Sequence, residues 1–129
     1  MSFDKLIEKY LSENLVKKEK ASTLAVEKAI QRSLKDLESA KANLAIDEGI
    51  SYTVAYLAML RAGRALMLLK GYRPSGEYQH RTVVEFVGQL LGKDYEAVID
   101  RFDKMRKKRN LFTYEIDITI SGTEARNAF

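Results

Sequence analysis

Proline is almost absent from this sequence, since Pro74 is the only one in 129 residues. Proline breaks helices because it has no backbone N–H and clashes with the preceding turn, so the rest of the chain is open to long helices. Hydrophobic residues recur at intervals of three and four along most of the chain. This is the period of amphipathic helices, and we expect an all-α fold, an antiparallel up-down bundle of about five helices.

Residues 22–46, which follow a short opening helix, show this period most clearly. Ser22 or Thr23 is a suitable N-cap, because a hydroxyl oxygen accepts a hydrogen bond from the first turn. The run Asp-Glu-Gly at 47–49 is suited to end the helix, since glycine adopts the left-handed conformation. The face expected to be buried consists of Val26, Ile30, Ser33, Leu37, Ala40 and Leu44.

Three further helices are expected. The first, at about 51–70, is apolar on nearly all sides and should be central, except that Arg61 and Arg64 share a stripe and need solvent, a charge partner or a ligand. Residues 71–76 contain two glycines and the proline and predict a loop. The next two helices, the second at about 95–111, have apolar stripes formed by Val83, Val84, Val87, Leu90 and Leu91, and by Tyr95, Val98, Ile99, Phe102 and Met105.

The C-terminal residues show a different period. Ile116, Ile118 and Ile120 alternate with polar residues, which predicts a short extended segment. Ser121 or Thr123, followed by Glu124, then predicts the start of another helix.

Composition limits the classes of function. The length fits one domain spanning residues 1–129. The absence of cysteine and the single histidine leave no pattern for a metal site or a disulfide, no cofactor motif is found, and the cytoplasm is the expected location. No segment is long and apolar enough for a membrane anchor. The formal charge of +4 mildly favours anionic partners such as nucleotides or RNA.

One arginine stands where an apolar helix face should continue. Within the charged run "DKMRKKRNLFTYE", Arg109 follows Phe102 by seven residues and points in nearly the same direction, while Arg106 lies at the edge of that stripe. The other basic residues of the run fit a solvated helix end. Because burial of an unpaired guanidinium is costly, Arg109 requires a carboxylate, a phosphate or a wet cleft.

Simple structural roles are open for each of these residues. Arg109 could form an ion pair with Asp47 or Glu48, and Asn110 could be a C-terminal cap. Tyr114 could be a packed aromatic with its hydroxyl at the surface. His80 is better explained as a hydrogen-bonding residue at a helix start than as a catalytic group.

These residues and the helices before them resemble the HEPN family, the higher eukaryotes and prokaryotes nucleotide-binding domain. The resemblance is carried by "LKDLESAKANL", "SYTVAYLAMLRAGRALMLLKGYRPS", "YQHRTVVEFVGQLL" and "RKKRNLFTYE". It implies an all-α domain that forms a homodimer. Catalytic members of the family carry an arginine, a polar residue that is often asparagine, and then a histidine, and two copies of this motif form a metal-independent ribonuclease.

Arg109 and Asn110 match the first two motif positions, but the third falls on Tyr114. A tyrosine with a pKa near 10 stays protonated at neutral pH and is a poor general base, whereas histidine exchanges protons readily. Arg109 would still hold a phosphate, and Tyr114 would still donate a hydrogen bond or stack on a base. The resemblance therefore favours binding over cleavage.

Three functional hypotheses follow. The leading one is a dimeric module that binds a nucleotide or RNA through Arg106, Arg109 and Asn110, and by resemblance works with a nucleotidyltransferase-type protein. The second is a ribonuclease toxin of a toxin–antitoxin pair, with Arg109, Asn110 and Tyr114 as catalytic residues. The third is a structural assembly protein. The resemblance also implies a substantial last helix, which is expected to be very short or missing after Phe129.

Overall fold

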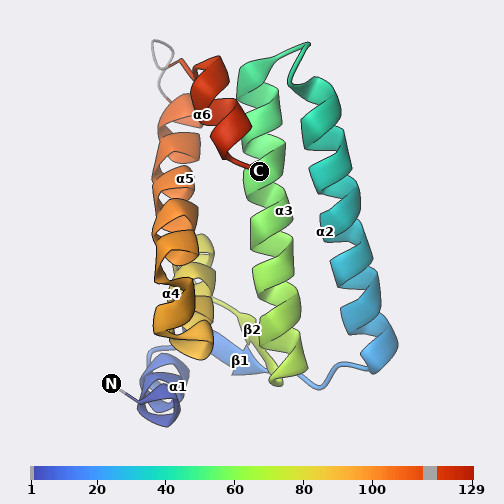
Figure 1. The fold of residues 1–129 in the computed structure, drawn as a ribbon. Coiled ribbons are helices and arrows are strands. Elements are labelled where there is room, and N and C mark those ends of the chain that lie inside the picture. The colour runs from blue at the N-terminus through green and yellow to red at the C-terminus, as the bar shows by residue number, and fades with distance from the viewer. Residues whose placement is uncertain (1, 115–118) are drawn as a thin grey trace.

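The computed structural model describes residues 2–114 and 119–129. Within them the chain forms helices that run up and down beside one another, together with a small two-stranded sheet (Figure 1). The expectation of an all-α bundle is confirmed. None of the described helices combines the length and apolarity needed to cross a membrane. The helices are α1 (Phe3–Ser12), α2 (Thr23–Asn43), α3 (Glu48–Leu69), α4 (Gln79–Leu91), α5 (Glu96–Tyr114) and α6 (Gly122–Asn127), with a 3-10 turn, Lys93–Tyr95, before α5.

Helices α2 and α3 form a long antiparallel hairpin. The side chain of Ser22 caps α2 by accepting a hydrogen bond from the backbone N–H of Ala25 at 3.1 Å. Between the helices, Ser33 donates to the carbonyl oxygen of Ala58 and Ser51 donates to that of Ala40, each at 2.6 Å. Small side chains at these contacts bring the two backbones close together.

The connection between α2 and α3 differs from expectation. Helix α2 ends at Asn43, and the side chain of Asp47 accepts a hydrogen bond from the N–H of Ile50 at 3.0 Å, which makes Asp47 the N-cap of α3. Gly49 lies inside α3, so its predicted role in ending α2 was wrong. A Cβ atom at Gly49 would stand 2.4 Å from Cζ of Phe112, so the glycine is needed for close packing against α5.

The core surrounds α3, which Figure 1 shows between α2 and α5 with α4 behind. Two of the predicted apolar stripes include residues that the structure leaves exposed. Ile30 on α2 is exposed. Tyr95 belongs to the 3-10 turn and is exposed too, and Val98 in the first turn of α5 is 52% exposed. The largest fully buried side chains include Tyr56, Leu60 and Met67 of α3, Val83 and Phe86 of α4, and Met105 of α5.

A small sheet forms, and one of its strands lies in the segment that the sequence predicted to be a loop. Strand β1 (Val16–Lys18) pairs antiparallel with β2 (Tyr72–Pro74), with Val16 opposite Pro74 and Lys18 opposite Tyr72. Strands of three residues are too short to show an alternating pattern, which is why the sequence did not indicate them. After β2, Gly76 has φ +67°, and a Cβ atom there would lie 2.9 Å from the carbonyl oxygen of Asn14.

The end of the chain forms the helix that the sequence predicted. Ser121 and Glu124 form a capping box at the start of α6, each side chain accepting a hydrogen bond from the other residue's backbone N–H. Helix α6 packs on α3. Of the predicted extended segment, Ile116 and Ile118 lie outside the described residues, and Ile120 is buried.

Candidate functional site

A tyrosine and the only histidine of the chain meet between two helices. Tyr56 on α3 is completely buried, and its hydroxyl lies 2.9 Å from Nδ1 of His80 at the start of α4. The ring of Tyr56 also packs against the imidazole and against the ring of Phe102, each with centroids 5.8 Å apart. His80 is thus a hydrogen-bonding residue at a helix start, but its partner is a side chain of another helix.

The hydrogen bond determines which imidazole nitrogen carries the proton. Burial raises the pKa of Tyr56 to about 12, so its hydroxyl stays protonated at neutral pH. Among the described residues, Nδ1 of His80 is the hydrogen-bond partner of that hydroxyl. We therefore assign Tyr56 as the donor and Nδ1 as the acceptor, an assignment that gives the neutral imidazole a proton on Nε2 as a hydrogen-bond donor.

The charges of three arginines act on this pair. Burial, together with the positive charges of Arg64, Arg109 and Arg106, lowers the pKa of His80 below its ordinary value of 6.5. The same three arginines act on the Tyr56 hydroxyl, so Arg64 of α3 and the two arginines of α5 lie near enough to influence both members of the pair. His80 is neutral at physiological pH, and the site has excess positive charge.

Arg109 is half-buried and incompletely satisfied. Its Nε atom is buried and has no hydrogen-bond acceptor in the part of the chain that the structure describes. Its Nη1 atom donates to Oδ1 of Asn110 across a long 3.4 Å. No described carboxylate forms an ion pair with it, so the proposed pairing with Asp47 or Glu48 is not observed, and Asp47 caps α3 instead.

Arg106 has a different environment. It is only 17% exposed, and its guanidinium forms an ion pair with Asp103 at 2.9 Å, which Lys107 joins at 3.2 Å. Burial opposes ionisation of Asp103, but hydrogen bonds from Arg106 and Lys107 outweigh it and lower the pKa of this carboxyl. The charge of Arg106 is thus largely compensated, and a ligand would compete with Asp103 for it.

The two arginines of the α3 stripe have separate roles. Arg61 forms an ion pair with Asp36 of α2, whose side chain is 5% exposed, and Arg32 joins the same carboxylate at 3.1 Å. This cluster holds α2 against α3. Arg64, one turn further on, forms no ion pair with any described residue, so it and Arg109 are the cations with uncompensated charge at the site.

The last two motif positions are only partly described. Asn110 lies within α5, which continues to Tyr114, so its interpretation as a C-terminal cap was wrong. The side chain of Tyr114 lies outside the described residues. Tyr56 and Arg64 were not among the predicted site residues, although the unexplained arginine stripe of α3 pointed to Arg64.

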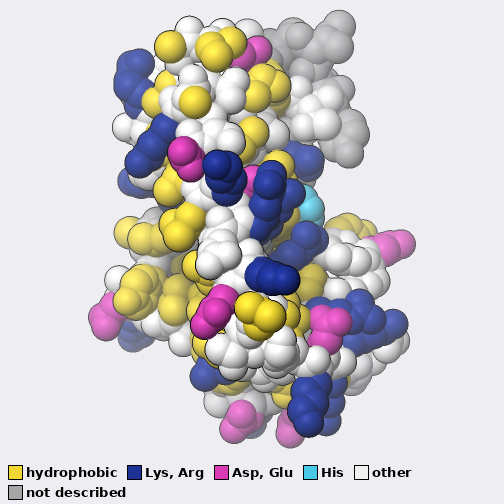
Figure 2. All heavy atoms as spheres, turned by 90° about the vertical axis from the view of Figure 1, so that its right-hand side faces the viewer, with side chains coloured by type: hydrophobic (Ala, Val, Ile, Leu, Met, Phe, Trp, Pro, Cys, Tyr) yellow, Lys and Arg dark blue, Asp and Glu magenta, His cyan; other side chains and the backbone are white. Residues whose placement is uncertain are grey.

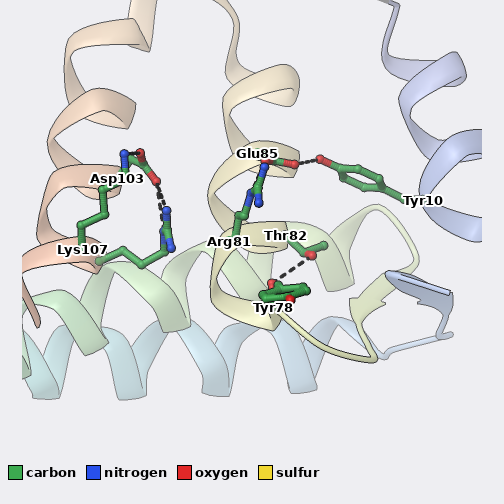
Figure 3. Close-up of polar contacts among 8 residues, drawn as sticks. Tyr10, Tyr78, Arg81, Thr82, Glu85, Asp103 and Lys107 are labelled. Atoms are coloured by element: carbon green, nitrogen blue, oxygen red, sulfur yellow. Dashed lines mark hydrogen bonds and ion pairs between the residues drawn. The ribbon is translucent and has the colours of Figure 1, made fainter. Parts of the chain in front are cut away.

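A groove of about 1100 Å³ lies between α1, α4 and α5, and Arg106 is the residue of the cluster that lines it. Figure 3 shows the polar contacts along the wall of this groove. Among them, the hydroxyl of Tyr10 on α1 donates a hydrogen bond to the carboxylate of Glu85 on α4. From the side of α2, Figure 2 shows Lys and Arg side chains gathered in the middle of the face, with the histidine beside them.

The described residues contain no group of three His, Cys, Asp or Glu side chains that could hold a metal ion. Comparison with models of known protein families, with curated proteins and with solved structures found no match.

Proposed function

We propose that this chain is a HEPN-type domain that binds the phosphate of a nucleotide or RNA at the cluster of Arg64, Arg109 and His80. The observation that carries the proposal is the guanidinium of Arg109, half-buried on an apolar helix face, with a buried Nε that lacks a described acceptor. An incompletely satisfied buried guanidinium is costly for folding unless a ligand supplies the missing acceptor.

The donor set of the cluster favours phosphate. Arg109 and Arg64 supply planar donor groups with positive charge, and the tautomer of His80 adds a neutral N–H donor. A phosphate offers several acceptor oxygens, and guanidinium groups bind it by paired hydrogen bonds. Binding would also place negative charge among uncompensated cations, which stabilises both.

The geometry favours binding over cleavage. Nδ1 of His80 accepts the hydroxyl proton of Tyr56, and Nε2 already carries a proton, so the neutral imidazole has no lone pair left to act as a base. The motif position at which catalytic members of the family have a histidine is Tyr114.

The homodimer and the nucleotidyltransferase-type partner belong to the same proposal, because the resemblance implies both. Support comes from large apolar side chains that α2 leaves exposed, notably Leu24 and Leu34. Exposed apolar side chains of this kind are commonly covered by protein partners. Sedimentation velocity of the wild type and of Leu34→Glu tests the dimer, which the added charge is expected to weaken if α2 contributes to the interface.

Binding is tested with a fluorescently labelled single-stranded RNA in EDTA, comparing wild type, Arg109→Ala and Arg101→Ala. Arg101 is the matched control because it lies on the same helix and is exposed. Loss of one charge-assisted contact of about 1.5 to 3 kcal/mol should weaken binding by Arg109→Ala roughly tenfold or more, and Arg101→Ala should change it little.

Two outcomes would contradict the proposal. Equal loss of affinity in both variants would mean that binding depends only on net charge. RNA cleavage in EDTA that disappears in Arg109→Ala would instead assign the protein as a metal-independent ribonuclease, and Tyr114→His would then be expected to increase the activity.

A further inference from the structure

Tyr78 combines an exposed ring with an unfavourable backbone. It precedes the first residue of α4, with φ 60° and ψ 36°, the left-handed region that residues with a Cβ atom rarely adopt. Its side chain is 69% exposed and packs against no other described aromatic ring. Neither the ring nor the backbone conformation therefore contributes favourably to the folded state in an obvious way.

The position of Tyr78 connects it with the proposed phosphate site. It lines the groove between α1, α4 and α5 together with Arg81 and Arg106, and it stands two residues before His80. Figure 3 shows the Tyr78 ring beside the first turn of α4, where Thr82 donates to its carbonyl oxygen. Arg106 lines the groove, and its charge also acts on His80, so the groove and the arginine cluster share this residue.

The groove has no large excess of positive charge that would favour a second phosphate. Arg81 is paired with Glu85 at 2.9 Å and Arg106 with Asp103 at 2.9 Å. The lining also holds Glu96 and Asp100 on the acidic side and Lys9, Lys93 and Lys107 on the basic side, so its charges nearly balance. Beyond the cluster, the groove suits an uncharged polar and planar group better than a polyanion, and an exposed aromatic ring is the usual surface on which an unpaired nucleobase stacks.

We infer that the ring of Tyr78 stacks on the base of the nucleotide whose phosphate is bound at Arg64, Arg109 and His80. This inference rests on the proposed function and narrows its ligand to a nucleotide with an unpaired base, as in single-stranded RNA. Bases of a duplex are stacked on their neighbours and do not present a face to the ring.

The test uses two probes, adenosine 5′-monophosphate and ribose 5-phosphate, which share the phosphate and the sugar but differ in the base. His80 is the only histidine of the chain, so its imidazole signal in a proton NMR titration reports on the site without ambiguity. Wild type is expected to bind adenosine 5′-monophosphate more tightly, by roughly 5- to 150-fold if stacking has its usual strength.

Tyr78→Gly is the decisive variant. Glycine adopts the left-handed conformation without strain, so the variant should fold with unchanged or higher thermal stability while it lacks the ring. It is expected to lose most of the preference for adenosine 5′-monophosphate and to keep the affinity for ribose 5-phosphate. Tyr78→Phe retains the ring and should bind both probes as wild type does.

Each other result has a defined meaning. Unchanged affinity for adenosine 5′-monophosphate in Tyr78→Gly, together with loss in Arg109→Ala, would overturn the stacking role and leave the proposed function intact. Equal weakening of both probes in Tyr78→Gly would also overturn it, since the residue would then shape the phosphate site. Failure of the wild type to bind either probe would overturn both the inference and the proposed function.

Discussion

The buried hydroxyl of Tyr56 lies 2.9 Å from Nδ1 of His80 and joins the middle of α3 to the start of α4. The tyrosine belongs to the hydrophobic core, whereas the histidine reaches the arginine cluster. Core packing thereby orients an imidazole in the proposed binding site, and the state of that imidazole is open to direct measurement.

Tyr56→Phe removes the hydrogen bond and keeps the ring. The free energy of unfolding is expected to fall by about 1 kcal/mol, the usual net value of one hydrogen bond. In the wild type, the imidazole nitrogen shifts of His80 should show a proton on Nε2, and in the variant a mixture of both tautomers. A proton on Nδ1 in the wild type would contradict the assignment of donor and acceptor.

Acid should destabilise the protein through His80. Its pKa is lowered in the folded state by burial and then by Arg64, Arg109 and Arg106, so the unfolded chain binds more protons just below pH 6.5. Stability present above this pH is therefore lost progressively as the pH falls below it. Urea unfolding at several pH values measures the effect, and in His80→Gln this part of the pH dependence should disappear.

Arg109→Met should separate stability from binding. Replacing a buried guanidinium that lacks a described acceptor by an apolar side chain of similar length is expected to raise the free energy of unfolding by about 1 kcal/mol. RNA affinity should fall at the same time. Thermal unfolding and RNA titration of the same preparation measure both, and a clear loss of stability would mean that Arg109 has a structural role.

The Asp36 cluster should be important for the α2–α3 hairpin. Asp36→Ala leaves Arg61 facing α2 without its carboxylate and is expected to cost about 2 kcal/mol, below the range for a fully buried pair because Arg61 is half exposed. Arg32→Ala removes only the exposed partner and should cost less than about 1 kcal/mol. Equal losses in denaturant unfolding would contradict this division.

Gly63 should tolerate no side chain where α3 crosses α4. A Cβ atom there would stand 2.6 Å from Cγ1 of the buried Val83. Gly63→Ala is therefore expected to cost about 1 to 2 kcal/mol despite the better helix propensity of alanine. The double variant Gly63→Ala with Val83→Ala should lose less stability than the two single variants together. Alanine at position 83 lacks the Cγ1 atom that the new Cβ atom would meet.

The helices could be predicted because their period is a local property. Ser22, Ser121 and Glu124 also show their capping roles in the sequence, since a cap depends on residues three positions away. The same approach failed for Gly49, whose role depends on Phe112 of a distant helix. It also placed Ile30 in the core, although α2 packs mainly against one neighbour and leaves this residue exposed.

The site could be predicted only where one helix determines it. The helical period placed Arg106 and Arg109 near the apolar stripe of α5, and both are largely or partly buried. It could not bring Tyr56, Arg64 and His80 to them, because this requires the relative placement of three helices. Nor could it show that Asp36, a charged residue on an amphipathic helix, is buried beneath Arg61.

The small sheet has a consequence for the order of folding. It joins Val16 to Pro74, and the intervening chain is the α2–α3 hairpin. Closing such a long loop in an unfolded chain costs conformational entropy, and this cost slows the step. A hairpin that forms first brings the two strands close together. We therefore expect the sheet to appear after the hairpin, so Asp36, which belongs to neither strand, influences the rate at which the strands pair.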